Sequence, residues 1–213
     1  MTEPAALGDL ELAALVSSRI CHDVINPVAA ISNGLEMLAE EPDQAMRDAA
    51  MDLIRKSAAQ ASAKLQFARL AFGAAAGSAG AEIDLRDAEN AARAFVSGTG
   101  KHQVNWLGQA ATLPKNKVKL LLNLVALGVA ALPRGGTIHV EIGGTPPEAS
   151  FAVRATGEAA RLSDQVRGLL SGANGVAVDT HSIQPYYAKR VAAASGMAVT
   201  AEAREGEVEF KAA

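Results

Sequence analysis

The residues best suited to chemistry in this sequence lie in one short stretch, His22-Asp23-Val24-Ile25-Asn26-Pro27. A neutral imidazole such as that of His22 is a good nucleophile near neutral pH. Asp23 could hold the ring in one tautomer or accept its proton. Asn26, one helical turn further on, could orient a water molecule or a carboxylate of a partner. These residue types favour nucleophilic chemistry at His22.

A long amphipathic helix must position this histidine. Ile20 and Val24 belong to an apolar stripe, and each lies two positions from His22, about 200° around a helix. His22 therefore faces away from the stripe, among small and polar neighbours, where a partner can reach it. Pro27 lies in the same helix and removes one intrahelical hydrogen bond. The stripe comprises Leu12, Val16, Ile20, Val24, Val28, Ile31, Leu35 and Leu38.

A second stripe predicts a second helix and therefore a helical hairpin. Between the stripes, Pro42 in Glu40-Glu41-Pro42-Asp43 ends the first helix, and Asp43 can cap the second. A lone hairpin cannot bury both stripes, whereas two copies side by side form a four-helix bundle. We therefore predict a homodimer through this segment. The second stripe comprises Met46, Ala50, Leu53, Ser57, Ala61, Leu65, Ala68 and Phe72.

The rest of the chain predicts a domain in which strands and helices mix. Small residues from Gly73 to Gly80 are typical of a linker, so we divide the chain into a helical hairpin at 1–76 and an α+β domain at 77–213. Because strands and helices do not alternate strictly, a sandwich of a sheet and helices is favoured. We expect strands at 83–85, 103–107, 137–142, 150–154, 198–203 and 207–211, and helices at 86–96, 115–131, 162–170 and 183–195.

Composition narrows the classes of function. The 213 residues are 49% hydrophobic, enough for a buried core, and carry a net charge of -3. This charge and an aromatic content of 4% argue against a nucleic-acid partner, which would favour basic and stacking side chains. The apolar run from Leu120 to Leu132 is too short to span a membrane and predicts a buried helix, so we expect no membrane partner. A single cysteine and a first segment unlike a signal peptide indicate a cytoplasmic protein.

The other reactive side chains have simpler interpretations. His102, His139 and His181 are scattered, with no spacing suited to a metal site, so we interpret them as structural histidines. Cys21 has no further ligand near it in sequence and is interpreted as a small residue that packs in the helix. One cluster is expected to be a solvated helix start or, alternatively, to steer an acidic partner: Lys115, Lys117 and Lys119.

The hexapeptide at His22 resembles the phosphoacceptor box of the dimerisation and histidine-phosphotransfer domain of two-component histidine kinases. The match falls on His22, Asp23, Asn26 and Pro27. This resemblance implies that His22 accepts a phosphoryl group, that Asp23 and Asn26 support it, and that a receiver domain docks beside it. The expected docking residues on the accessible side of the helix are Arg19, Ile25 and Ala29.

The nucleotide-binding boxes of those kinases are missing from the second domain. Asn123 to Gly128, followed by Gly135-Gly136-Thr137-Ile138, lines up with the kinase helix that holds magnesium, but Leu127 stands where that helix carries a ligating Asn. The stretch 155–159 lacks the carboxylate that contacts adenine. His181-Ser182-Ile183-Gln184-Pro185-Tyr186 stands in place of the last glycine box. We therefore expect an ATPase-like fold without ATP, and no cofactor or metal of its own.

A phosphoacceptor hairpin joined to an ATPase-like domain without ATP motifs resembles the ChpT family of histidine phosphotransferases, over nearly the whole chain. The resemblance implies a dimeric shuttle in a cell-cycle phosphorelay, which passes a phosphoryl group between receiver aspartates through phosphohistidine at His22. It implies as partners the receiver domain of a CckA-like hybrid histidine kinase and CtrA-like and CpdR-like response regulators, with Mg²⁺ bound on the receiver. Two alternatives stay open: a non-catalytic dimeric pseudokinase scaffold that binds response regulators, and a histidine kinase with an aberrant ATP site.

Overall fold

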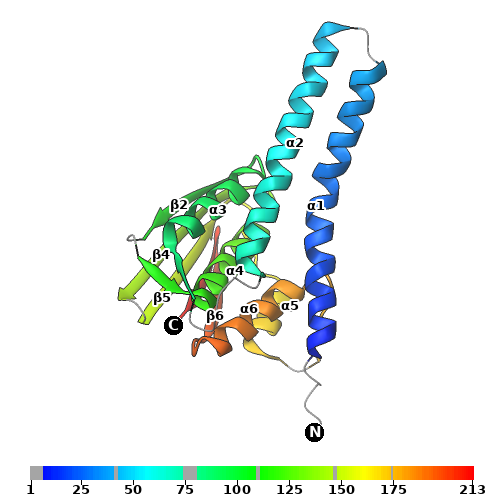
Figure 1. Ribbon diagram of the computed structural model, residues 1–213. Helices are drawn as coiled ribbons and strands as arrows, with labels where there is room; N and C mark the ends of the chain where they lie inside the picture. Colours follow the sequence, from blue (N-terminus) through cyan, green and yellow to red (C-terminus); the bar gives the residue numbers. More distant parts are fainter. Residues whose placement is uncertain (1–6, 41–42, 74–80, 109–110, 146–147, 174) are drawn as a thin grey trace.

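The computed structural model describes residues 7–40, 43–73, 81–108, 111–145, 148–173 and 175–213. Within these ranges, two long helices form an extended hairpin that stands beside a sandwich of a sheet and four shorter helices (Figure 1). The predicted α+β class is confirmed. Pro42, the predicted helix break, and the predicted linker beyond Gly73 lie outside the described residues.

The hairpin consists of α1 (Asp9–Glu40) and α2 (Gln44–Ala71). The Asp43 carboxylate accepts a hydrogen bond from the Met46 backbone N–H at 3.0 Å, which confirms the predicted cap of the second helix. Close packing of the two helices depends on Gly34, which is buried in α1. A Cβ atom at position 34 would lie 2.7 Å from Cγ1 of Ile54 on α2.

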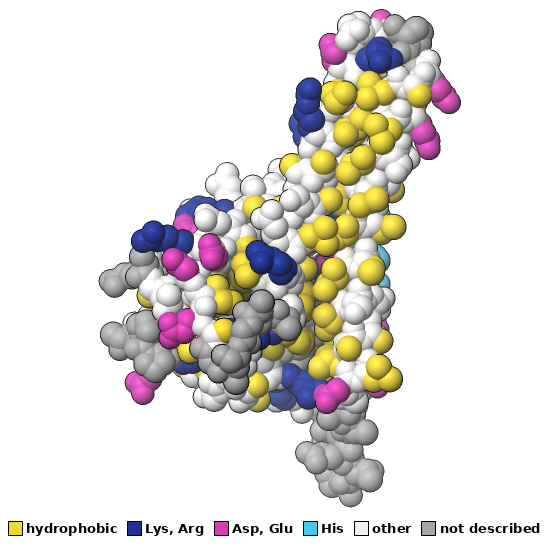
Figure 2. All heavy atoms as spheres, in the orientation of Figure 1, with side chains coloured by type: hydrophobic (Ala, Val, Ile, Leu, Met, Phe, Trp, Pro, Cys, Tyr) yellow, Lys and Arg dark blue, Asp and Glu magenta, His cyan; other side chains and the backbone are white. Residues whose placement is uncertain are grey.

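The hairpin leaves much of its two apolar stripes uncovered within one chain. Figure 2 shows hydrophobic side chains running as a continuous band along both helices. No described helix, these two included, is long and apolar enough to cross a membrane. The stripe residues that remain between 38% and 55% exposed are Val28, Leu35, Met46, Leu53 and Leu65.

The sandwich is built on a five-stranded sheet of order β2-β4-β5-β7-β6, in which β2 runs parallel to β4 and the other neighbours are antiparallel. A second, two-stranded antiparallel sheet joins β1 to β3. Helices α3, α4, α5 and α6 all contact strands of the larger sheet. The bounds are β1 (Glu82–Asp84), α3 (Leu85–Ser97), β2 (His102–Leu107), β3 (Thr112–Pro114), α4 (Lys115–Ala131), β4 (Gly136–Thr145), β5 (Glu148–Thr156), α5 (Asp164–Ser171), α6 (Ile183–Ala194), β6 (Val199–Arg204) and β7 (Glu207–Ala212).

Helix α4 is the centre of the core. It is buried continuously from Val118 to Gly128, as expected for a helix that is apolar on all sides. Asn123, a polar residue within this buried stretch, is also fully buried and donates a hydrogen bond from Nδ2 to the Ala71 carbonyl oxygen at 3.0 Å. This bond attaches the end of α2 to the core.

Most predicted elements are confirmed with ends shifted by a few residues, and α4 has its predicted bounds. Strand β3 was not predicted. Two interpretations are wrong. Cys21 is exposed rather than packed. Lys119 is buried rather than solvated, because it lies one turn into α4, and burial together with the charge of Lys115 lowers the pKa of its ammonium group.

The hairpin contacts the sandwich through both of its helices. On the α2 side, Phe67 is almost fully buried and stacks on Phe95 of α3, with ring centroids 4.0 Å apart. On the α1 side, Arg190 of α6 forms a 3.4 Å ion pair with Asp9. The loop before α6 also reaches the middle of α1. These contacts bring the second domain to the turn of α1 that carries His22.

Candidate functional site around His22

His22 lies on the open side of α1 with 55% of its side chain exposed, so its predicted accessibility is confirmed. Its Nδ1 lies 3.8 Å from Oδ1 of Asp23. This distance is too long for a hydrogen bond, but the carboxylate charge still favours a proton on Nδ1. A proton there leaves the Nε2 lone pair free to attack an electrophile.

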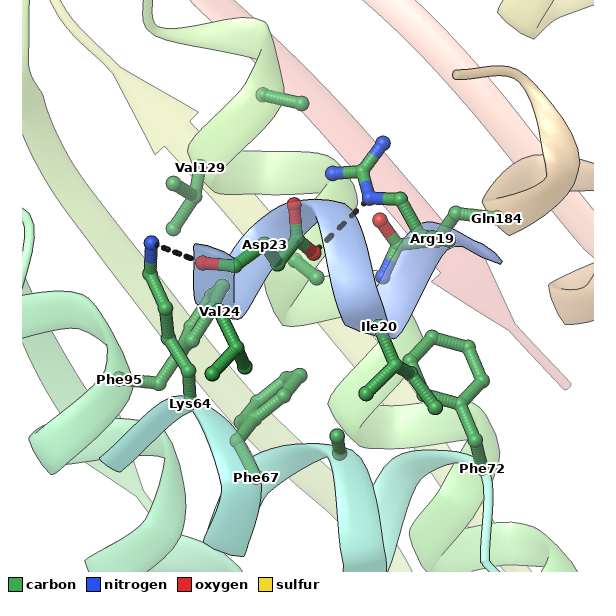
Figure 3. Close-up of a pocket in the computed structure, with 13 residues that line it drawn as sticks. Arg19, Ile20, Asp23, Val24, Lys64, Phe67, Phe72, Phe95, Val129 and Gln184 are labelled. Atoms are coloured by element: carbon green, nitrogen blue, oxygen red, sulfur yellow. Dashed lines mark hydrogen bonds and ion pairs between the residues drawn. The ribbon is translucent and has the colours of Figure 1, made fainter. Parts of the chain in front are cut away.

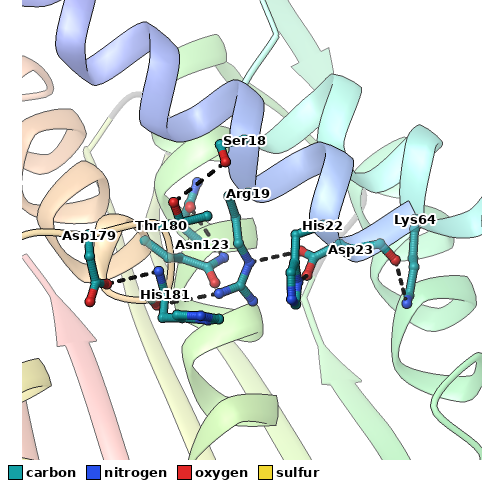
Figure 4. Close-up of polar contacts among 10 residues, drawn as sticks. Ser18, Arg19, His22, Asp23, Lys64, Asn123, Asp179, Thr180 and His181 are labelled. Carbon is teal, nitrogen blue, oxygen red and sulfur yellow. Dashed lines mark hydrogen bonds and ion pairs between the residues drawn. The ribbon is translucent and has the colours of Figure 1, made fainter. Parts of the chain in front are cut away.

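The Asp23 carboxylate is held by Arg19, one turn earlier on the same helix. Nε of Arg19 donates to Oδ2 at 2.9 Å, which leaves Oδ1 as the oxygen nearer to His22. The same guanidinium donates from Nη1 to the carbonyl oxygen of His181 at 3.3 Å (Figure 4). Arg19 therefore orients Asp23 and ties α1 to the second domain. The docking role expected for it stays a prediction.

A lysine from α2 replaces the hydrogen bond that Pro27 removes. In an unbroken helix, the N–H of residue 27 would donate to the carbonyl oxygen of Asp23, four residues earlier. Here Nζ of Lys64 donates to that oxygen at 2.7 Å (Figure 3). A charge-assisted bond from the second helix thus holds the turn that carries both His22 and Asp23. The sequence predicted the lost bond but not its replacement, because Lys64 lies 41 residues from Asp23.

A tight turn in front of α6 approaches α1 from the second domain. Oδ1 of Asp179 accepts hydrogen bonds from the backbone N–H of His181 at 2.9 Å and from the N–H and hydroxyl of Ser182, both at 2.8 Å. The Ser182 hydrogen bonds, foremost that of its hydroxyl, hold the pKa of the Asp179 carboxyl below its ordinary value. The Thr180 hydroxyl lies 3.5 Å from that of Ser18 on α1.

This turn places the ring of His181 beside that of His22. The two ring centroids are 5.4 Å apart and the rings are nearly perpendicular, at 85°. Figure 4 shows both imidazoles on the same side of α1 as the Asp23 carboxylate. His181, interpreted from the sequence as a structural histidine, therefore lies at the candidate site. No local sequence pattern connects the two histidines; long-range packing brings them together.

The remaining predicted residues lie on the surface next to His22. Asn26, Ile25 and Ala29 are all exposed, and Ile25 is 59% exposed despite its apolar side chain. The structure therefore joins His22, Asp23 and Arg19 into one constellation and leaves the other predicted residues around it. The functional roles of all six stay predictions.

A small cavity lies behind this turn of α1, between the hairpin and α4 (Figure 3). Its volume of about 140 Å³ is below the usual range of ligand pockets, about 300–1,000 Å³. Its lining combines Phe67, Phe95 and Val129 with the already bonded polar groups of Arg19 and Lys64. We interpret it as a packing feature of the junction.

Within the described ranges, no three His, Cys, Asp or Glu side chains are grouped to hold a metal ion.

Comparison with known proteins assigns this chain to a family of phosphotransferases. Residues 85–207 match the family described as the histidine phosphotransferase C-terminal domain. The chain is 45% identical over 213 residues to the protein phosphotransferase ChpT of Brucella abortus (strain 2308), with 100% of both sequences covered. A solved bacterial phosphotransferase is similar over 100% of both chains, with a TM-score of 0.89 and 42% identity. A weaker likeness, with a TM-score of 0.49 and 12% identity, is to the histidine kinase domain of a blue-light-activated kinase from Erythrobacter litoralis, over 87% of this chain and 94% of that one.

Proposed function

Because this chain belongs to the ChpT family of histidine phosphotransferases and is itself a phosphotransferase, we propose that it carries a phosphoryl group between receiver aspartates through phosphohistidine at His22. One observation above all supports the proposal. His22 is exposed, its Nδ1 faces the Asp23 carboxylate, and its Nε2 has no hydrogen-bond partner among the residues that the structure describes. A phosphorelay intermediate needs such a nucleophile, since the phosphoryl group arrives already activated on the receiver.

In the proposed forward step, Nε2 of neutral His22 attacks the phosphorus of an aspartyl phosphate in line. The N–P bond forms while the P–O bond to the aspartyl group breaks, and the receiver carboxylate leaves as an anion. The ring keeps its Nδ1 proton and becomes an imidazolium, whose positive charge the facing Asp23 carboxylate stabilises. The carboxylate of a second receiver reverses the step and returns His22 to its neutral form.

In this proposal the charge on the transferring oxygens is neutralised by Mg²⁺ on the receiver, since divalent metal usually supplies that charge in phosphoryl transfer. This chain brings no cofactor of its own. The contribution of this chain is to position the nucleophile: Arg19 orients Asp23, and Lys64 holds the turn that carries His22. Such a role agrees with the cytoplasmic setting expected from the sequence.

The proposed assembly is a homodimer with two equivalent sites. The apolar band on the hairpin is long enough to pair with the same band of a second copy, because its exposed side chains extend from Leu65 to the far end near Met46 (Figure 2). Pairing would complete the four-helix bundle that a single hairpin cannot form. It would leave His22 accessible on the outside.

The proposed partners are receiver domains that dock over His22, with Ile25, Ala29 and Arg19 contributing to the contact surface. From the family resemblance we propose the receiver of a CckA-like hybrid kinase as one partner. CtrA-like and CpdR-like regulators are the proposed recipients, in a relay that serves the cell cycle. Apolar Ile25 would supply binding area, and Asn26 would lie within reach of a water or carboxylate near the phosphoryl group.

A phosphotransfer gel tests the proposal with one donor, a phosphorylated receiver. The full-length protein is incubated with labelled ATP alone or with the labelled receiver, and the second reaction is repeated with His22→Ala. His139→Ala is the matched control, since His139 lies on β4 with its ring bonded within the sheet. We expect acid-labile label from the receiver only, retained in His139→Ala and lost in His22→Ala.

The other outcomes identify the alternatives. Label taken from ATP alone would show a histidine kinase with an aberrant ATP site. Binding of a competent receiver without any label would show a scaffold. Label that persists in His22→Ala would place the phosphoacceptor at another residue and overturn the assignment of His22.

A further inference from the structure

We propose that His181 is a second residue of the phosphotransfer site, and that its ring donates an N–H hydrogen bond to the phosphoryl group carried by His22. The second domain would then take part in the transfer directly, by supplying a side chain to it. This inference rests on the proposed phosphotransfer through His22 and names a further residue for the same reaction.

The first observation is the arrangement of the two rings. Their centroids are 5.4 Å apart and their planes are nearly perpendicular, so the edge of one ring faces the other. The nitrogens of an imidazole lie on its edge. A phosphoryl group on Nε2 of His22 would extend beyond the edge of that ring, and at this centroid separation its oxygens can come within reach of an N–H on the neighbouring ring.

The second observation concerns the hydrogen bonds of the four histidines. Both ring nitrogens of His102 and both of His139 are bonded inside the second domain, at 2.7–3.4 Å. Within the part of the chain that the structure describes, no ring nitrogen of His22 or His181 has a hydrogen-bond partner. The two histidines with unused ring nitrogens are therefore the two that lie together.

The third observation is that the backbone of His181 is held in place. Asp179 closes the turn through three hydrogen bonds, one of them to the His181 N–H. Arg19 and Ser18 attach the turn to α1, the helix that carries His22. Because the backbone that carries the ring is already in position beside α1, the chain does not have to rearrange when the phosphoryl group arrives, a condition that favours the contribution of a hydrogen bond to a transfer.

The neighbouring charged side chains Arg19 and Asp23 are less suited than His181 to donate a hydrogen bond to the phosphoryl group. The guanidinium of Arg19 is already bonded to Asp23 and to the His181 carbonyl. Asp23 is negative and would repel phosphoryl oxygens. In the proposed role no covalent bond to His181 forms or breaks: its N–H donates a hydrogen bond to one phosphoryl oxygen while the N–P bond at His22 forms, and this hydrogen bond is lost when the group leaves.

The test compares two substitutions in the full-length protein. His181→Phe keeps an aromatic ring against His22 but has no N–H, whereas His181→Gln keeps an N–H donor without the ring. His139→Phe is the matched control at a histidine outside the site. For each protein, the transfer rate from a labelled receiver to His22 is measured against receiver concentration, and a melting temperature close to that of the wild type shows that the variant is folded.

We expect His181→Phe to lower the saturating transfer rate about tenfold to a hundredfold, the range of one hydrogen bond to a charged group, with little change in the half-saturating receiver concentration. His181→Gln should recover part of the rate, and His139→Phe should match the wild type. An unchanged rate in His181→Phe would overturn the inference. A change only in the half-saturating concentration, or equal losses in the Phe and Gln variants, would do the same.

This experiment separates the inference from the function on which it rests. If the wild-type protein accepts no label at His22, the proposed function fails before His181 is considered. If the label appears at His22 with the same kinetics in every His181 variant, the function stands and only the role of His181 is overturned.

Discussion

Replacing Lys64 by methionine tests how the turn of α1 that carries His22 is held. The substitution keeps most of the apolar stem and removes the ammonium group that donates to the Asp23 carbonyl at 2.7 Å. That oxygen then has no donor in the helix, because Pro27 has no N–H. A hydrogen bond to a charged group contributes about 1.5–3 kcal/mol, and water replaces part of it at this partly exposed position.

We therefore expect Lys64→Met to lower the free energy of unfolding by about 1–2 kcal/mol. For a chain of this size, this loss corresponds to a fall in melting temperature of about 2–8 °C. The measurement is urea unfolding monitored by circular dichroism. All proteins are compared at one fixed concentration, because the stability of a dimer depends on protein concentration. The matched control is Lys56→Met, which changes an exposed lysine of the same helix and should alter stability by less than about 0.5 kcal/mol.

A double-mutant cycle shows whether the carbonyl is the group that matters. Pro27→Ala restores an N–H that can donate to the Asp23 oxygen, so Lys64→Met should cost about 1 kcal/mol less in that background than in the wild type. Equal costs in the two backgrounds would refute the reasoning, since Lys64 would then stabilise the protein through some other contact.

Three further predictions concern the rest of the fold. Gly34→Val should lower the free energy of unfolding by about 1–3 kcal/mol in thermal melts, because the new side chain meets Ile54; an unchanged melt would contradict the close packing. Lys119→Met should raise the free energy of unfolding, measured by urea unfolding, by about 1 kcal/mol, because a buried charge is removed. A lower free energy of unfolding in this variant would contradict that explanation. The pKa of Asp179 is lower in the folded than in the unfolded protein, so its contribution to stability is complete above about pH 4 and is lost as the pH falls through the folded value. Wild type and Asp179→Asn should therefore converge in stability on acidification, and a constant difference would contradict the role of Ser182 as its partner.

The sequence predicted those parts of the fold that depend on local pattern. Helix α4 has its predicted bounds, because the apolar run that begins at Leu120, interrupted only at Asn123, is long enough to identify a buried helix by itself. The hairpin followed from two stripes with helical spacing, and the exposure of His22 followed from its angle to Ile20 and Val24. Each of these inferences uses only residues within a few turns of one another.

The remaining features depend on contacts between distant segments. Strand β3 is three residues long and exists through its pairing with β1, so its own residues give too weak a signal. The bond from Lys64 to Asp23 and the approach of His181 to His22 join parts of the chain that no short pattern relates. The sequence could therefore identify the candidate nucleophile, but not the lysine that holds its turn or the second imidazole beside it.

The position of His22 on α1, next to Asp23 and close to His181 of the second domain, also sets the order of events under the proposed function. His22 offers a single ring with Asp23 and His181 beside it, so a receiver that reaches this ring excludes any other. The donor must leave before an acceptor can bind, which predicts double-displacement kinetics for the exchange. Regulators that draw on the same phosphohistidine then compete for it, and each receives a share set by its abundance and its affinity for the site.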